Sequence, residues 1–205
     1  MLMQPIDTRP IDTQPNETRP TDEGRPSDEQ IWRWLEEVPD PEVPVISVVE
    51  LGIVRTIGWD GDSLVVTVTP TYSGCPATRV INDDIVAHLA ERGIDKVRME
   101  RRLSPAWTTA WLSDAGRRKL LDYGIAPPIE DGPGCAIGQA AASVVPVRML
   151  GKGDAFVPPP PPPSVTCPRC GTGDAERISQ FGSTPCKASY RCRECLEPFD
   201  YFKWI

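Results

Sequence analysis

The chain has 205 residues, a hydrophobic fraction of 40% and a formal net charge of −7. This size allows one ordinary domain with a small appendage. The acidic balance argues against a nucleic-acid partner, because phosphate binding is driven by Lys and Arg. No apolar run is long enough to span a bilayer, and the N-terminus lacks a signal-peptide pattern. We therefore expect neither nucleic acid nor membrane as a partner.

The chain contains a single histidine, His88, and this count excludes several catalytic metal sites. A di-iron carboxylate site needs two Glu-x-x-His pairs, and a facial triad or a Rieske centre needs two histidines. None of these can be formed by this chain alone. We therefore assign no catalytic residue. His88 is expected on the solvated side of a helix.

Both a tail and a linker are predicted from proline content. Residues 1–27 repeat a Pro-containing pentad with few apolar groups, which is typical of a disordered tail. Residues 126–163 are rich in Gly, Pro and Ala, and end in six consecutive prolines. Such a run favours a stiff polyproline II spacer, so the segment after it is expected to be isolated from the rest.

Residues 28–125 are predicted to form a small α+β domain. Ser27 can cap a first helix that Pro39 ends, and Pro76 can begin another helix that Gly93 stops. Further elements in chain order are strands at 53–59, 64–68 and 97–103 and a last helix at 108–123. The order α-β-β-α-β-α predicts a three-stranded sheet covered by helices.

Four cysteines in residues 164–205 form two Cys-x-x-Cys knuckles. They are Cys167, Cys170, Cys192 and Cys195. Two such knuckles can place four thiolates tetrahedrally around one soft metal, with zinc as the default, so we predict a zinc ribbon with a structural metal. A disulfide framework is the alternative. Knuckle spacing and an odd cysteine total favour a reducing compartment, so we expect a cytoplasmic protein.

Cys186 lies six residues before the second knuckle and is a possible additional thiol. It could serve as a spare ligand or a redox thiol, or it could pack beside the metal. Cys135 lies in the Gly- and Pro-rich segment and has no visible partner.

Among the cysteines outside the knuckles, Cys75 has the position that best fits a functional thiolate. It ends a strand-to-helix loop, Thr69 to Cys75, directly before Pro76. Free backbone N–H groups and the positive end of the helix dipole favour a thiolate there. Such a thiolate suits metal or cluster capture or nucleophilic attack, whereas an inert half-buried cysteine is the alternative. A cysteine hydrolase would need a base that His88 is poorly placed to supply.

Other candidates have simpler explanations. Asp40, Glu42 and Glu50 form a carboxylate group before the first strand, where Asp40 could merely shape a turn. Trp107 and Trp111 are four residues apart and can share a helix face, either in the core or as an aromatic docking patch.

Several motifs together resemble the iron–sulfur cluster assembly domain family. They begin at Asp40 (DPEVPVIS), Glu50 (ELGIV), Thr71 (TYSGCPA) and Pro105 (PAWTTAWLSD). The C-terminal motifs ISQFGSTPCK and EPFDYFK resemble a narrower family, the D subunits (PaaD/PaaJ) of phenylacetyl-CoA epoxidase, also called phenylacetate-CoA oxygenase. The family pattern often has a further cysteine where Trp204 stands here, which puts any site using that thiol in doubt.

The resemblance implies an α/β domain in which Cys75, with Asp40, Glu42 and Thr71, handles iron or a transient iron–sulfur cluster. It further implies a maturation factor for the metal centres of a multicomponent monooxygenase in aerobic phenylacetate degradation. The implied partners are the oxygenase and reductase subunits and the iron–sulfur assembly machinery, and a homodimer is compatible with the sequence.

Two alternatives stay open at this point. One is an integral oxygenase subunit that transfers electrons through an iron-loaded four-cysteine site, although Leu196 after the second knuckle weakens the comparison with rubredoxin. The other is a plain zinc-ribbon interaction module without metal traffic.

Overall fold

The computed structural model describes residues 25–129 and 164–203. Three predicted parts lie outside the described residues: the tail up to residue 24, residues 130–163 of the linker with Cys135 and the proline run, and Trp204. The first residue of the predicted linker, Ala126, lies in a strand instead. Within the described residues, none of the helices has both the length and the apolar character needed to cross a lipid bilayer.

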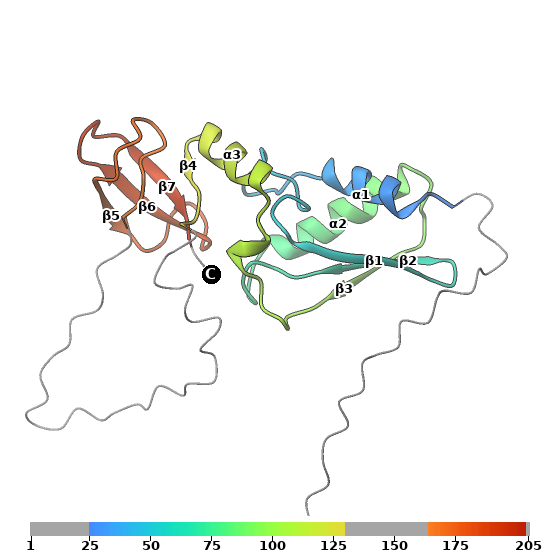
Figure 1. The fold of residues 1–205 in the computed structure, drawn as a ribbon. Helices are drawn as coiled ribbons and strands as arrows, with labels where there is room; N and C mark the ends of the chain where they lie inside the picture. The colour runs from blue at the N-terminus through green and yellow to red at the C-terminus, as the bar shows by residue number, and fades with distance from the viewer. Residues whose placement is uncertain (1–24, 130–163, 204–205) are drawn as a thin grey trace, which may run out of the picture.

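The first domain is built around a three-stranded sheet, as predicted. Strands β1 (Val54–Asp60) and β2 (Ser63–Val68) pair antiparallel through the turn at Gly61, and β3 (Val97–Arg101) pairs parallel with β2. Helix α2 (Ala77–Ala90) makes the crossover between β2 and β3, which parallel pairing requires. Helix α1 (Asp28–Glu36) packs on α2, and both helices lie over the same face of the sheet (Figure 1).

Local signals in the sequence explain the two helices. The Ser27 side chain accepts a hydrogen bond from the Gln30 N–H and caps α1. On α2, residues four apart point into the core, and the glycine at 93 takes a φ of +86° that ends the helix. The buried residues of α2 are Ala77, Ile81, Ile85 and Leu89.

The helix expected at 108–123 is divided in two, which corrects the prediction. A short 3-10 helix covers Thr109–Trp111, and α3 covers Asp114–Tyr123. The break has a local cause, because the Ser113 hydroxyl accepts from the Gly116 N–H at 3.0 Å and so starts a new helix. Trp107 and Trp111 consequently do not share a helix face.

His88 is not on a solvated face. Its side chain is 21% exposed, and its Nε2 lies 3.4 Å from Glu37 Oε2, so the histidine lies against the C-terminal end of α1.

The C-terminal segment forms a second sheet, here called the ribbon. It contains β5 (Ala175–Ser179), β6 (Lys187–Cys192) and β7 (Pro198–Phe202), paired antiparallel. A fourth strand, β4 (Ile125–Ala126), follows α3 and pairs parallel with β7, giving the order β4-β7-β6-β5. The chain that leaves the first domain therefore completes the ribbon's sheet.

The ribbon also shares the hydrophobic core of the first domain. Phe202 and Cys186 are 1% and 4% exposed, and both belong to the cluster of buried residues that fills that core. The Phe202 ring lies 6.1 Å from the Trp107 ring, centroid to centroid. The expectation that the proline run isolates the knuckle segment is therefore wrong for the described residues, because the ribbon packs directly against the first domain (Figure 1).

We predict that Phe202→Ala weakens this packing. Deleting a buried aromatic ring costs about 3 kcal/mol, and here the loss falls on the contact with Trp107. Hydrogen exchange should accelerate in β4 and in residues 104–112 as well as in the ribbon. Phe199→Ala is the matched control, because Phe199 stacks on Tyr190 within the ribbon's own cluster. Equal protection of residues 104–112 in the two variants would contradict the assignment of Phe202 to the interface.

Candidate functional site

The loop between β2 and α2 presents Cys75 at the surface. The Cys75 N–H donates to the Tyr72 carbonyl at 3.1 Å, and the Cys75 carbonyl accepts from the Thr78 N–H at 3.3 Å, which closes a tight turn before α2. The thiol is half-buried and forms no disulfide with any described residue. Behind it lies a small apolar pocket lined by Ile53, Val68, Pro70, Cys75, Thr78, Ile81 and Asn82. Cys75 is thus both held in place and reachable, whereas Thr71 is buried at the start of the loop.

Asp40 shapes the turn that carries Glu42. Its Oδ1 accepts hydrogen bonds from the N–H groups of Glu42 at 2.9 Å and Val43 at 2.8 Å, and the residue is 5% exposed. Burial raises the pKa of Asp40 above its ordinary value, and the two N–H donors oppose that shift. The geometry supports the turn role of Asp40, while a role in metal handling stays a prediction.

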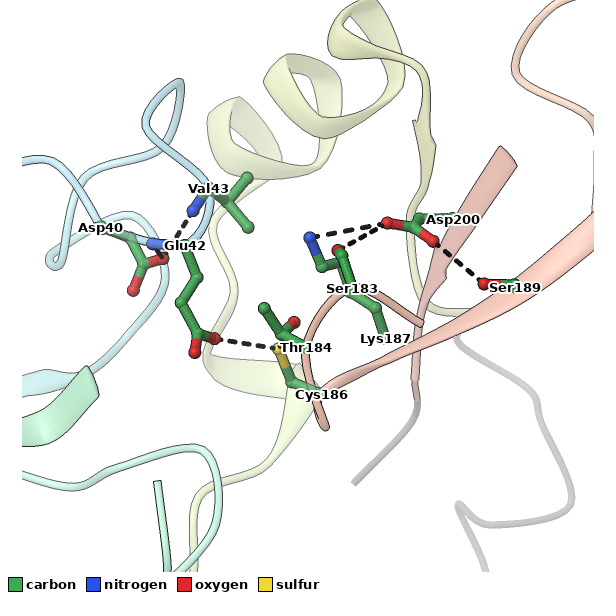
Figure 2. A network of polar contacts seen from close by, with 9 residues as sticks. All are labelled: Asp40, Glu42, Val43, Ser183, Thr184, Cys186, Lys187, Ser189 and Asp200. Atoms are coloured by element: carbon green, nitrogen blue, oxygen red, sulfur yellow. Dashed lines mark hydrogen bonds and ion pairs between the residues drawn. The ribbon is translucent and has the colours of Figure 1, made fainter. Parts of the chain in front are cut away.

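The structure brings Glu42 to Cys186, 144 residues away in sequence (Figure 2). The Cys186 thiol donates to Glu42 Oε2 over 3.7 Å and lies 3.0 Å from Thr184 Oγ1. Burial, and the negative charge of Glu42 after it, raise the pKa of Cys186 to about 11, although the Thr184 hydroxyl opposes them. The pKa of Glu42 is raised as well, first by burial and then by Asp40. A protonated thiol therefore faces a carboxylate across the domain interface.

Tyr72 lies three residues before Cys75 in the same loop. Its hydroxyl oxygen is buried and has no hydrogen-bond partner among the described residues. Burial, followed by the negative charges of Cys75, Glu42 and Cys186, raises the pKa of Tyr72 to about 12. The Tyr72 hydroxyl is thus neutral.

Lys187 is a buried cation at the same interface. The Lys187 side chain is 6% exposed, and its Nζ lies 3.6 Å from Asp200 Oδ2. Asp200 in turn accepts hydrogen bonds from the Ser183 and Ser189 hydroxyls (Figure 2). The positive charge of Lys187 acts to lower the pKa values of Asp40 and Glu42, so it partly offsets the negative charge at the interface.

The four knuckle cysteines form the second site. Their sulfur atoms all lie within 4.8 Å of one another, with Cys167–Cys195 at 3.8 Å and Cys170–Cys192 at 3.5 Å. These distances are far longer than a disulfide bond of about 2.05 Å. Four thiolates about 2.3 Å from one ion would be separated by about 3.8 Å, so the residues fit a tetrahedral metal. The alternative of a disulfide framework therefore does not describe this site.

Both knuckles take the same backbone path. Gly171 and Leu196, which directly follow the second cysteine of each knuckle, have φ values of +76° and +63°. The absence of glycine at 196 therefore does not alter the turn, although a left-handed leucine costs about 1 kcal/mol. Backbone N–H groups of Arg169 and Cys195 donate to the sulfurs of Cys167 and Cys192 at 3.4 Å, which stabilises the thiolates.

The remaining candidates have structural roles. Glu50 pairs with Lys119 at 2.7 Å. The Trp107 indole donates to the Leu51 carbonyl at 3.0 Å within the core, and Trp111 lies beneath the Arg55 guanidinium. The sequence reasoning missed Tyr72 and Lys187. Tyr72 stands inside the Cys75 loop motif and could have been considered there, whereas no local pattern marks a buried Lys187.

Comparison with known proteins divides the chain as the structure does. A family model described as "Iron-sulfur cluster assembly protein" matches residues 28–98, and one described as "PaaD zinc beta ribbon domain" matches residues 157–203. A protein of Escherichia coli strain K12, named as the D subunit of a "Putative 1,2-phenylacetyl-CoA epoxidase", is 41% identical over 180 residues, which cover 88% of this chain and 94% of that protein.

Two shorter relatives match the first domain. The "Fe-S protein maturation auxiliary factor" of Porphyromonas gingivalis W83 is 31% identical over 96 residues, covering 46% of this chain and 90% of the relative. The "Fe-S protein maturation auxiliary factor YitW" of Bacillus subtilis strain 168 is 34% identical over 87 residues, covering 42% of this chain and 81% of the relative.

The fold and the two sites define the class of protein: an iron–sulfur assembly domain joined to a four-cysteine ribbon. The similarity to the E. coli protein extends over both parts. The chain belongs to the family of phenylacetyl-CoA epoxidase D subunits, the PaaD family.

We predict that Asp40→Asn is tolerated and that Asp40→Ala is not. Because burial raises the pKa of Asp40, ionisation of this carboxyl lowers stability as the pH rises through that raised pKa. Asparagine keeps the oxygen that accepts from Glu42 and Val43 without the charge, whereas alanine loses both hydrogen bonds, at a cost of about 2 kcal/mol. Chemical denaturation of the two variants at neutral and acidic pH measures their free energies of unfolding. Equal damage by the two substitutions would show that the charge, not the turn, matters.

We also predict that the knuckles lose their metal as the pH falls. Burial raises the pKa of Cys192, but the N–H groups of Cys195 and Glu194 bring it to about 7. The Glu197 N–H lowers the pKa of Cys195, yet burial and the neighbouring sulfurs raise it to about 12. The metal-free set thus keeps protons at neutral pH, and metal binding must release them. Competition with a coloured chelator between about pH 6 and 8 should show affinity rising with pH.

Loss of the metal as the pH falls should unfold the ribbon and leave the first domain folded. Removal of the metal is expected to abolish hydrogen-exchange protection in β5, β6 and β7, while β1 to β3 stay protected. A ribbon that keeps its protection without metal would contradict a structural role for the ion.

Proposed function

We propose that this protein is a maturation factor that takes up iron or an iron–sulfur cluster at Cys75 and passes it to a metalloprotein. The observation that carries the proposal is the position of Cys75. It is a half-buried thiol that forms no disulfide with a described residue, and it lies on the turn before α2 in the same loop as Tyr72. The two Fe-S maturation factors that match the first domain support the same role.

The two sites differ in a way that suits uptake and release at Cys75. The knuckle sulfurs form a complete set of four, of which Cys167 and Cys192 are buried, so an ion there has no open position. Cys75 is reachable and does not belong to any group of three ligands close enough for one ion among the described residues. An incomplete ligand set holds a metal less firmly and leaves positions for a recipient's ligands.

The client in this proposal is a multicomponent phenylacetyl-CoA epoxidase, with its oxygenase and reductase subunits as partners. The name of the E. coli relative, which this chain matches over most of its length, supports that assignment. The single histidine agrees with an accessory role, because the chain alone cannot form a di-iron carboxylate site.

In the same proposal the knuckle metal is zinc with a structural role. The alternative is electron transfer through iron in the four-cysteine site, and one observation favours it: both knuckles have the same left-handed backbone despite Leu196. Metal analysis and the visible spectrum of protein purified without oxygen separate the two. One colourless zinc per chain supports the structural role, whereas a thiolate–iron absorption band would favour electron transfer.

We predict that Cys75→Ala abolishes transfer while leaving the fold intact. The thiol is half-buried and its removal leaves the knuckles untouched, so stability should change by less than about 1 kcal/mol. Cluster loading and epoxidase activity are measured in cells that lack the natural copy. Ser73→Ala, at an exposed residue of the same loop, is the control and should behave as wild type. Undiminished cluster loading by the Cys75 variant would sink the proposal.

A further inference from the structure

The segment that follows β3 is exposed but held at both ends. Residues 101–106 are all exposed, and Leu103 is 47% exposed. The Arg102 N–H donates to the Val68 carbonyl at 2.9 Å, which fixes the start of the segment on the end of β2. Trp107, directly after the segment, is buried and fixes its end in the core. The segment is therefore an exposed surface with a defined position.

Two arginines at the start of this segment lie beside the Cys75 loop. Strands β2 and β3 run parallel, so they end at the same edge of the sheet, where the loop to α2 begins (Figure 1). Arg101 is the register partner of Val68, and Val68 and Cys75 line the same small pocket. Arg102 follows directly. Both arginines thus stand at the edge of the sheet where the Cys75 thiol is reachable.

Neither arginine is neutralised by a carboxylate of the described residues. Arg98, on the same strand, pairs with Asp60 at 2.9 Å and with Glu100 at 3.4 Å. No such ion pair joins Arg101 or Arg102 to a described residue. Two exposed guanidinium groups are therefore available to a partner.

The charge of this edge is opposite to that of the chain as a whole. The net charge is −7, yet residues 69–76 and 101–108 contain two arginines and no Asp or Glu. The carboxylate of Glu42 faces Cys186 across the domain interface. A cationic edge on an acidic protein favours a partner that carries carboxylates, which Arg can bind through two parallel hydrogen bonds. Nucleic acid fits less well, because the rest of the chain repels phosphate.

We propose that Arg101 and Arg102, with Leu103, dock a carboxylate-rich segment of the metalloprotein that receives the cargo of Cys75. This inference rests on the proposed function and adds where the recipient binds and by which chemistry. Leu103 supplies an apolar contact beside the two charges, a combination that is common at protein interfaces. Docking at this edge brings the recipient next to the reachable thiol.

Such docking has a signature that a purely structural role would not produce. Contacts between exposed charges act mainly on the rate of encounter, and salt screens them within about 10 Å at 0.1 M. Binding of the recipient should therefore weaken as the salt concentration rises.

Charge reversal tests the proposal in purified full-length protein. Binding to the oxygenase subunits of the proposed client is measured at about 50 mM and about 300 mM salt. Arg101→Glu and Arg102→Glu should each weaken binding roughly tenfold at the lower salt concentration. Arg118→Glu, at an exposed arginine of α3, is the matched control, because it changes the net charge by the same amount. It should weaken binding by less than about twofold.

Iron content after loading without oxygen separates this inference from the proposed function. If Arg101→Glu and Arg102→Glu bind the subunits as tightly as Arg118→Glu, the docking surface is overturned and uptake at Cys75 stands. If they lose iron uptake together with binding, the arginines serve the metal site, and docking is again overturned. If Cys75→Ala takes up as much iron as the wild type, the proposed function fails and this inference fails with it.

Polyglutamate tests the chemistry of the partner without relying on the identity of the client. Its NMR perturbations on the wild-type chain should fall on residues 101–106 and on the Cys75 loop, and they should fade as salt is added. Perturbations elsewhere, or tighter binding of duplex DNA than of polyglutamate, would overturn the assignment to a carboxylate partner. Because no substitution is involved, this measurement also covers a variant that does not fold.

Discussion

The parallel pairing of β4 with β7 is the interaction on which the arrangement of this molecule depends. Two residues, Ile125 and Ala126, join the chain leaving the first domain to the last strand of the ribbon. The next contact along β7 places Phe202 against Trp107. With β7 held in this way, the Lys203 N–H anchors the carbonyl of Cys186, and the thiol reaches Glu42. The interface is thus built from backbone pairing, an aromatic contact and a polar network.

The two sulfur-containing sites differ in completeness and exposure. At the knuckles, four sulfurs lie within 4.8 Å of one another, and the backbone donates hydrogen bonds to two of them. Such a set retains its ion and contributes to folding. Cys75, by contrast, belongs to no such group among the described residues, and it stands half-buried on a surface loop. A complete set of this kind suits retention of an ion, whereas a single reachable thiol suits exchange, which is the basis of the proposed function.

Much of the fold could be predicted from local pattern, and the departures have physical reasons. Helix α2 and strands β1 to β3 have clear periodicity, and the knuckles are defined by cysteine spacing. Strand β4 has only two residues, too few for a period, so its pairing could not be expected. The division at Ser113 depended on one side-chain cap competing with continued helix.

The candidate site was predictable in its parts but not in its assembly. The Cys75 loop and the carboxylates near Asp40 were found from motif and residue type. The contact between Glu42 and Cys186 joins residues 144 positions apart, and such a contact leaves no local pattern in the sequence. The proline content of the linker even favoured the opposite expectation, because composition describes a segment's stiffness and not where its ends are attached.

The attachment of those ends has a consequence for how this chain can change. Ile129 and Val165 lie on either side of residues 130–163. Val165 is buried in the cluster that contains Tyr190 and Tyr201, and Ile129 packs against that cluster. The two ends of that segment are therefore held together by the folded parts. Docking of the ribbon therefore depends on packing between the folded parts, so a change in the length of the segment between residues 130 and 163 should have little effect on it.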